Sequence, residues 1–106
     1  MVRRGMKHAG QAYTHTIWKI KPGKQEEFIL RWTELADWTA LQGLSGKARL
    51  LRDLDDPNRF VSFGPWDSVA NAKRWRSLKD SHEHLKRLQE VLEDQEPRLL
   101  EVVVER

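Results

Sequence analysis

The stretch that decides the fold is RFVSFGPWDSVANAKRW, residues 59–75, in which a short strand passes through a tryptophan into a helix. Residues 59–66 are rich in aromatic and β-favouring residues and end at a proline–tryptophan pair. Asp67 or Ser68 can then cap the helix by accepting a backbone N–H bond. The stretch therefore predicts a strand followed directly by a helix.

This strand is apolar on both of its faces. Phe60 and Trp66 share one face, and the other face carries Val61, Phe63 and Pro65. A strand that is apolar on both faces is covered on both sides. A chain of 106 residues has helices for only one side. We therefore expect a homodimer in which a second copy covers the sheet face.

The composition describes one small globular domain. We place this domain at residues 12–106, after a mobile basic N-terminal tail at residues 1–11. The chain has no cysteine, which excludes disulfides, thiolate metal sites and cysteine nucleophiles. No apolar run follows the basic tail, so we expect neither a signal peptide nor a membrane partner, and a cytoplasmic location.

The net charge of +3 does not indicate binding to nucleic acid. Charges of both signs are interleaved, as where Lys86 and Arg87 are soon followed by Glu90 and Glu93. That pattern is typical of a solvated helix face. A nucleic-acid surface needs a stripe of one sign, usually with stacking aromatic residues. We expect no nucleic-acid partner.

The first half of the chain alternates between strand and helix signals. Residues 13–20 alternate and are rich in threonine and isoleucine, which predicts a strand. Apolar residues with helical spacing predict a helix from about residue 25 to residue 40. Residues 47–53 predict a second strand, and residues 54–58 have the composition of a turn.

The second half predicts a helical region and a final strand. The helical region starts near Ser68 and is interrupted around residues 79–81, where Ser81 can cap a second segment. Pro97 is expected to end that segment, and residues 98–104 to form the last strand. The order β-α-β-β-α-β predicts a ferredoxin-like α+β domain with an antiparallel four-stranded sheet.

Three segments carry a resemblance to a known family: IWKIKPGKQEEFILRW (17–32), ARLLRDLDDPNRFVSFGPWDS (48–68) and PRLLEVVVE (97–105). They resemble the antibiotic biosynthesis monooxygenase (ABM) family of dimeric α/β barrels. The resemblance implies two ferredoxin-like sheets packed face to face, with a pocket between sheet and helices in each subunit. It implies a cofactor-independent monooxygenase acting on an aromatic or polycyclic small molecule.

Trp66 is the residue that best matches the family's motif. In the family's oxygenases of aromatic polyketides, a tryptophan here accompanies an asparagine four residues earlier and a tyrosine six residues later. The corresponding residues in this chain are Ser62 and Ala72. We predict that Trp66 and Trp75 form a pocket wall with Ser62 on the strand side, and that Trp32 is core. The alternative is that Trp66 only plugs the end of the sheet.

His15 is the candidate catalytic residue. An imidazole facing the pocket could act as a general base near neutral pH. His15 and Trp18 have opposite parity on their strand, so at most one of them faces the pocket. A hydrogen-bonded interior or interface histidine is the alternative.

We expect no cofactor and no metal. The haem-degrading members of the family use an asparagine, a tryptophan and a histidine ligand. His82 and His84 are two residues apart, so they diverge on a helix. No cluster of histidines and carboxylates has metal-ligand spacing.

Other functions stay open at this point. The chain could be a non-catalytic small-molecule-binding or accessory protein on the same fold. A haem-degrading monooxygenase and an RNA-binding domain are weaker alternatives, because the sequence offers neither a haem ligand set nor a glycine–aromatic motif on the third strand.

Overall fold

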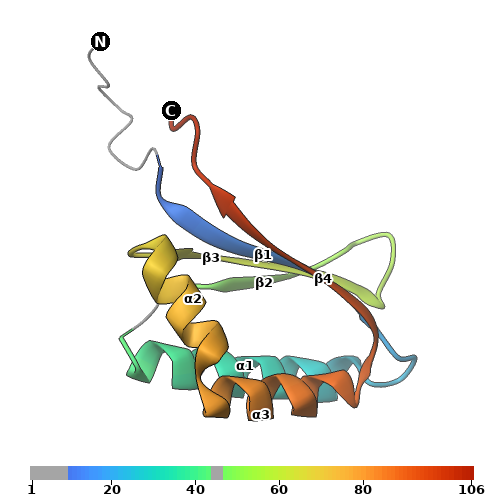
Figure 1. The fold of residues 1–106 in the computed structure, drawn as a ribbon. Coiled ribbons are helices and arrows are strands. Elements are labelled where there is room, and N and C mark those ends of the chain that lie inside the picture. Colours follow the sequence, from blue (N-terminus) through green and yellow to red (C-terminus); the bar gives the residue numbers. More distant parts are fainter. Residues whose placement is uncertain (1–9, 44–46) are drawn as a thin grey trace.

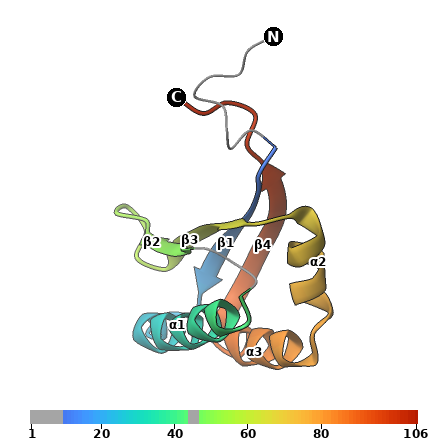
Figure 2. The ribbon, with the colours of Figure 1, turned by 90° about the vertical axis from the view of Figure 1, so that its left-hand side faces the viewer.

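The computed structural model describes residues 10–43 and 47–106 (Figure 1). A four-stranded antiparallel sheet has the order β2-β3-β1-β4. All the helices lie on one face of this sheet (Figure 2). The predicted ferredoxin-like α+β fold is confirmed. The elements are β1 (Ala12–Ile20), α1 (Gln25–Leu41), β2 (Arg49–Arg52), β3 (Arg59–Trp66), α2 (Val69–Ser77), α3 (Lys79–Gln89) and β4 (Leu92–Glu101).

Strand β3 has the predicted bounds and the predicted faces. Its alternate residues Phe60, Ser62, Gly64 and Trp66 are buried beneath the helices, and the residues between them are half-buried. Strand β1 follows the same rule, and Trp18 pairs with Phe60 on the buried face. No helix in the described part of the chain covers the opposite face of the sheet (Figure 2).

Helix α1 lies between two glycine-containing turns, close to the predicted bounds. Gly23 has a φ of +80° and Gly43 a φ of +66°, a conformation that glycine adopts without strain. Glu26 and Glu27 lie in the first turn, where negative charge favours the helix N-terminus. Residues 1–9 of the predicted tail, which was placed at residues 1–11, lie outside the described residues.

The predicted interruption of the second helical region occurs at Leu78, whose backbone is extended. Helix α2 starts as predicted after Ser68, whose Oγ accepts the N–H of Asn71 at 3.0 Å. The prediction that Ser81 caps the next segment is wrong, because α3 begins two residues earlier. Ser81 instead donates its hydroxyl to the Trp75 carbonyl at 2.5 Å, which ties α3 to α2 across the break.

The end of the last helix and the start of the last strand were predicted wrongly. Helix α3 ends at Gln89, and β4 runs from Leu92 to Glu101 rather than over residues 98–104. Val91 and Leu92 are buried core residues at the point where the chain turns from helix to strand. Pro97 lies inside β4, which is possible because β4 is an edge strand and needs fewer backbone N–H donors.

Strand β2 is shorter than the predicted 47–53 at both ends, and Asp53 ends it by organising the turn. The Asp53 carboxylate accepts the backbone N–H groups of Asp55 and Asp56 and pairs with Arg59 at 3.0 Å. The hydrogen bond from Asp55, more than the Arg59 interactions, lowers the pKa of Asp53 below its ordinary value.

The apolar core has two parts at opposite ends of the helix-facing side of the sheet. The larger part contains Trp18, Phe28 and Phe60, with Leu88 and Val91 from the end of α3 and the turn after it. The smaller part joins residues of β1, β3 and α2: Ala12, Trp66 and Ala72. The described helices include none that is long and apolar enough to cross a membrane.

Candidate functional site

A cavity of about 800 Å³ lies between the sheet and the helices. Its floor is the middle of β1 and β3, where Thr14, Thr16 and Ser62 line it. Large side chains follow on the same face, with Trp18 at one end and Trp66 at the other. Protein interiors otherwise pack closely, so short side chains between bulky ones leave a space. The cavity thus separates the two parts of the core.

Four of the five tryptophans of the chain line this cavity. Trp66 ends β3, and the turn capped by Ser68 places Trp75 of α2 against it. The two ring centroids are 5.9 Å apart with the rings at 61°, an edge-to-face contact. Trp18 and Trp32 complete the aromatic lining. Trp32 was expected in the core, but it is half-buried and borders the cavity.

The indole N–H groups of three lining tryptophans each donate a hydrogen bond to a hydroxyl oxygen of the cavity. An indole nitrogen can only donate, so each hydroxyl oxygen accepts. The pairs are Trp18–Ser62 at 2.9 Å, Trp66–Thr14 at 3.2 Å and Trp75–Thr39 at 2.8 Å.

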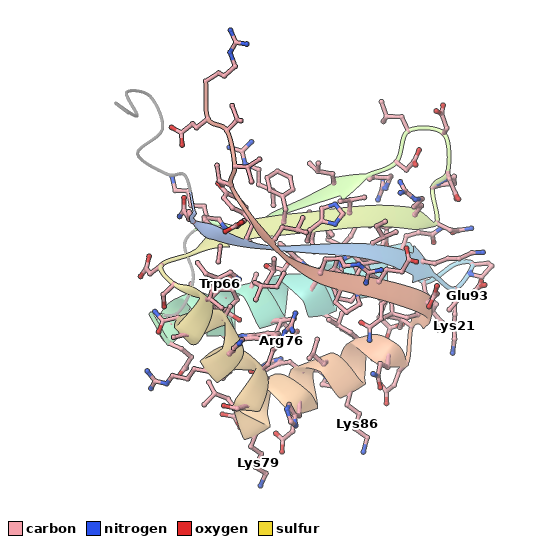
Figure 3. All side chains as sticks on the ribbon, turned by 45° about the horizontal axis from the view of Figure 1, so that its top comes forward. Lys21, Trp66, Arg76, Lys79, Lys86 and Glu93 are labelled. Atoms are coloured by element: carbon pink, nitrogen blue, oxygen red, sulfur yellow. The ribbon has the colours of Figure 1, made fainter. Side chains whose placement is uncertain are left out.

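Exposed charged residues also belong to the lining of the cavity. Arg76 projects from α2, and Figure 3 shows Arg76 and Trp66 on the side of the sheet that carries the helices. Lys47 precedes β2 and Asp37 belongs to α1. The edge strands add Arg49 and Arg98, although the pairing register places these two on the outer face.

The structure separates His15 from the predicted pocket residues. Ser62, Trp66 and Trp75 all line the cavity. His15 is half-buried on the opposite face of the sheet, where it pairs with Phe63. His15 could act as a general base only if it faced the pocket, and in this chain it does not.

The other described histidines also lie outside the cavity. His82 Nε2 is 2.6 Å from the Arg76 carbonyl oxygen, across the break between α2 and α3. The His84 ring lies 5.2 Å from that of Trp38. Residues 10–43 and 47–106 contain no group of three histidines, cysteines or carboxylates that could hold a metal ion.

Sequence reasoning predicted Ser62 on the pocket side but missed Thr14 and Thr16, which line the cavity floor with it. Thr16 and Ser62 are buried, and Thr14 is half-buried. The available signal was the run of small residues at alternate positions of two paired strands, between large residues on the same face. Thr39 of α1 is buried, as its helical spacing from Phe28 and Leu35 indicated.

A ferredoxin-like domain with a tryptophan-lined cavity between sheet and helices resembles several solved structures. SnoaB, a cofactor-independent oxygenase from Streptomyces nogalater, is 21% identical with a TM-score of 0.79, over 87% of this chain and 92% of that chain. A putative antibiotic biosynthesis monooxygenase from Bordetella bronchiseptica is 18% identical with a TM-score of 0.79, over 90% and 99%. A conserved protein from Methanosarcina mazei is 16% identical with a TM-score of 0.81, over 90% and 95%. These likenesses show the fold.

The sequence itself identifies the family. The family described as antibiotic biosynthesis monooxygenase matches residues 13–91, most of the chain. The protein belongs to this family, as the resemblance in its sequence implied. No curated protein matches the chain in sequence.

Proposed function

We propose that the chain is a cofactor-independent monooxygenase that oxidises an aromatic or polycyclic small molecule in the tryptophan-lined cavity. The observation that carries the proposal is this cavity of about 800 Å³ in a chain of the ABM family. Cavities of that size with aromatic walls and a few polar groups suit small organic ligands. SnoaB, which shares the fold, is a cofactor-independent oxygenase.

In such a reaction the enolate or phenolate of the substrate passes an electron to oxygen, and the protein binds and orients the substrate. Trp66 and Trp75 would hold the ring system, and Ser62 would hydrogen-bond an oxygen of the substrate. Ser62 is too weak a base to deprotonate a phenol. Because His15 lies on the opposite face of the sheet, we assign the loss of that proton to the acidity of the substrate.

Oxidation of an anthrone tests this function. An anthrone and one O₂ give the quinone and one water, so both absorbance and oxygen consumption report turnover. We expect the protein to accelerate the reaction in the presence of a chelator and Trp66→Ala to lose the acceleration. The alternative, a non-catalytic binding protein, is favoured by Ser62 and Ala72 at the two motif positions. Binding of the anthrone without turnover would support that alternative.

We also propose that the chain forms a homodimer through the sheet face opposite the helices. That face carries Ile17, Val61 and Phe63, which are half-buried. Leu51 and Leu100 extend it and are 48% and 47% exposed. Exposed apolar residues grouped on one face and bordered by charged ones mark an interaction surface. A second copy of the chain would cover the surface and form the dimeric α/β barrel.

A further inference from the structure

We propose that His15 makes the association of two copies of this chain sensitive to pH. The copies associate while the imidazole of His15 is neutral, and they separate when it takes up a proton. The inference rests on the proposed homodimer, since it concerns the regulation of that same sheet face. It gives a role to the histidine that faces away from the cavity.

His15 lies in the middle of the outer face of the sheet, which no helix of the described chain covers (Figure 2). Its strand, β1, has β3 on one side and β4 on the other. The pairing register places Phe63 of β3 and Arg98 of β4 directly beside it. Arg49 of β2 continues the same row beyond Phe63. A second copy on this face would cover the imidazole, which is already half-buried in one subunit.

The nearest charged neighbour of His15 is the guanidinium of Arg98. Like charges directly opposite one another on paired strands are destabilising. Arg98 Nη1 donates to the Pro97 carbonyl at 2.9 Å. Neither Arg98 nor Arg49 forms an ion pair within residues 10–43 and 47–106. A proton on His15 would therefore add a positive charge to a row that is already positive.

Glu96 of β4 is the acidic neighbour of His15, and it does not reverse this balance. It pairs with Ile17 and is thus diagonal to His15, at about 7–8 Å for such neighbours. It also lies two residues from Arg98 on the same face, so the two charges offset one another while His15 is neutral. Protonation then leaves one positive charge uncompensated. The other neighbours on this face are uncharged. They are Phe63, Val61 and Pro65 from β3, Tyr13 and Ile17 from β1 itself, and Leu100 from β4.

Covering this face favours the neutral imidazole for two reasons. Removing a charged group from water disfavours its charged form. In a dimer with twofold symmetry the face meets a copy of itself, so each added charge appears twice. The dimer would therefore release protons as it forms, and its affinity falls as the pH falls. Imidazole is the side chain that ordinarily titrates between about pH 5 and pH 8, whereas arginine keeps its charge throughout that range.

The test measures the dissociation constant of the dimer by fluorescence-detected sedimentation of the labelled full chain, which reaches low concentrations. The measurements are made in the same salt at about pH 8 and at about pH 5.5. Two imidazoles per dimer limit the effect to about 100-fold per pH unit. We expect the wild-type constant to be at least about tenfold higher at the lower pH, the effect of one displaced proton over one pH unit. Circular dichroism at each pH shows whether the protein stays folded.

Three variants assign the effect. His15→Gln stays neutral, so its dimer should be equally tight at both pH values. His15→Arg carries a fixed charge, so its dimer should be weak at both; if this variant does not fold, His15→Gln still decides. Arg98→Gln removes the nearest like charge and should reduce the effect of acid. The matched control is His82→Gln, which removes an imidazole from α3 on the other side of the sheet and should leave the effect of acid unchanged.

A wild-type monomer at both pH values would overturn the proposed homodimer, and this inference with it. A dimer whose affinity does not change with pH would overturn the inference and leave the homodimer standing. Tighter association in acid would overturn it as well, because a carboxylate of the partner would then face the imidazole. The same would follow if the acid monomer has lost its circular dichroism signal, or if His82→Gln removes the effect as fully as His15→Gln does. An unchanged effect in Arg98→Gln would overturn the part assigned to Arg98.

Discussion

Replacing Trp66 with alanine should reduce the free energy of unfolding by about 3–5 kcal/mol. The Trp66 side chain is 4% exposed and packs with Ala12 and Ala72 in the smaller part of the core. The substitution also removes the edge contact with Trp75 and the hydrogen bond to Thr14. Together these two interactions contribute about 1–3 kcal/mol. The remainder is the loss of buried apolar area and the space left behind.

Trp66→Phe is the matched variant, because it keeps an aromatic ring near Trp75 and loses the hydrogen bond to Thr14. We expect a smaller cost of about 1–2 kcal/mol. Urea unfolding followed by far-ultraviolet circular dichroism measures both variants, since removing a tryptophan changes the fluorescence signal itself. A Trp66→Ala protein within about 0.5 kcal/mol of wild type would refute the packing argument, since the expected loss is several times larger.

Binding separates packing from function. We expect Trp66→Ala to weaken binding of an aromatic probe more than Ser62→Ala does, because the indole supplies a wall and the hydroxyl supplies one hydrogen bond. Tryptophan quenching or calorimetry measures this difference below the melting temperature of each variant. A Trp66→Phe protein with normal stability and undiminished turnover would show that this tryptophan only packs.

Four further outcomes are expected. Phe63→Lys should place an unpaired charge in the proposed dimer interface and dissociate or unfold the protein, at a cost of several kcal/mol. Sedimentation that shows a folded wild-type monomer at micromolar concentration would contradict the dimer. Gly64→Ala should destabilise the domain by about 1–3 kcal/mol, because the added Cβ would lie 3.0 Å from the Ala48 Cβ; an unchanged melting temperature would contradict this. Asp53 has a lowered pKa, so its stabilising contribution is present above its ordinary value of 3.8 and is lost as the pH falls through its folded pKa. The stability difference between wild type and Asp53→Asn should therefore shrink in acid, and a difference that grows there would be inconsistent with the lowered pKa. Haem titration should give no stoichiometric Soret band.

Local patterns were sufficient to predict much of the fold. The bounds of β3 followed from an alternating aromatic segment that ends at a proline and a helix cap. Local patterns did not predict the boundary between α3 and β4. Glu93 and the polar residues after it read as a continuing helix, and Pro97 read as its end. Tertiary contacts determine this boundary, since β4 pairs with β1 and Val91 is buried in the core.

The site was predictable only in part. Trp66 and Trp75 could be placed on the cavity side because their spacing around a strand-to-helix turn is a local property. The hydrogen bonds from Trp18 to Ser62 and from Trp75 to Thr39 could not be predicted, because each joins residues that only the fold brings together. The side of the sheet that His15 faces also depends on which face the helices cover.

The division of the core has a consequence for how the protein unfolds. The cavity lies between the part around Phe28 and the part around Trp66, and among the described residues only Trp75 packs against both. A molecule that fills the cavity would add contacts between the two parts. Its binding should raise the melting temperature with ligand concentration. It should also slow amide hydrogen exchange in α2 more than in α1, because the helix that rests on the smaller part has more protection to gain.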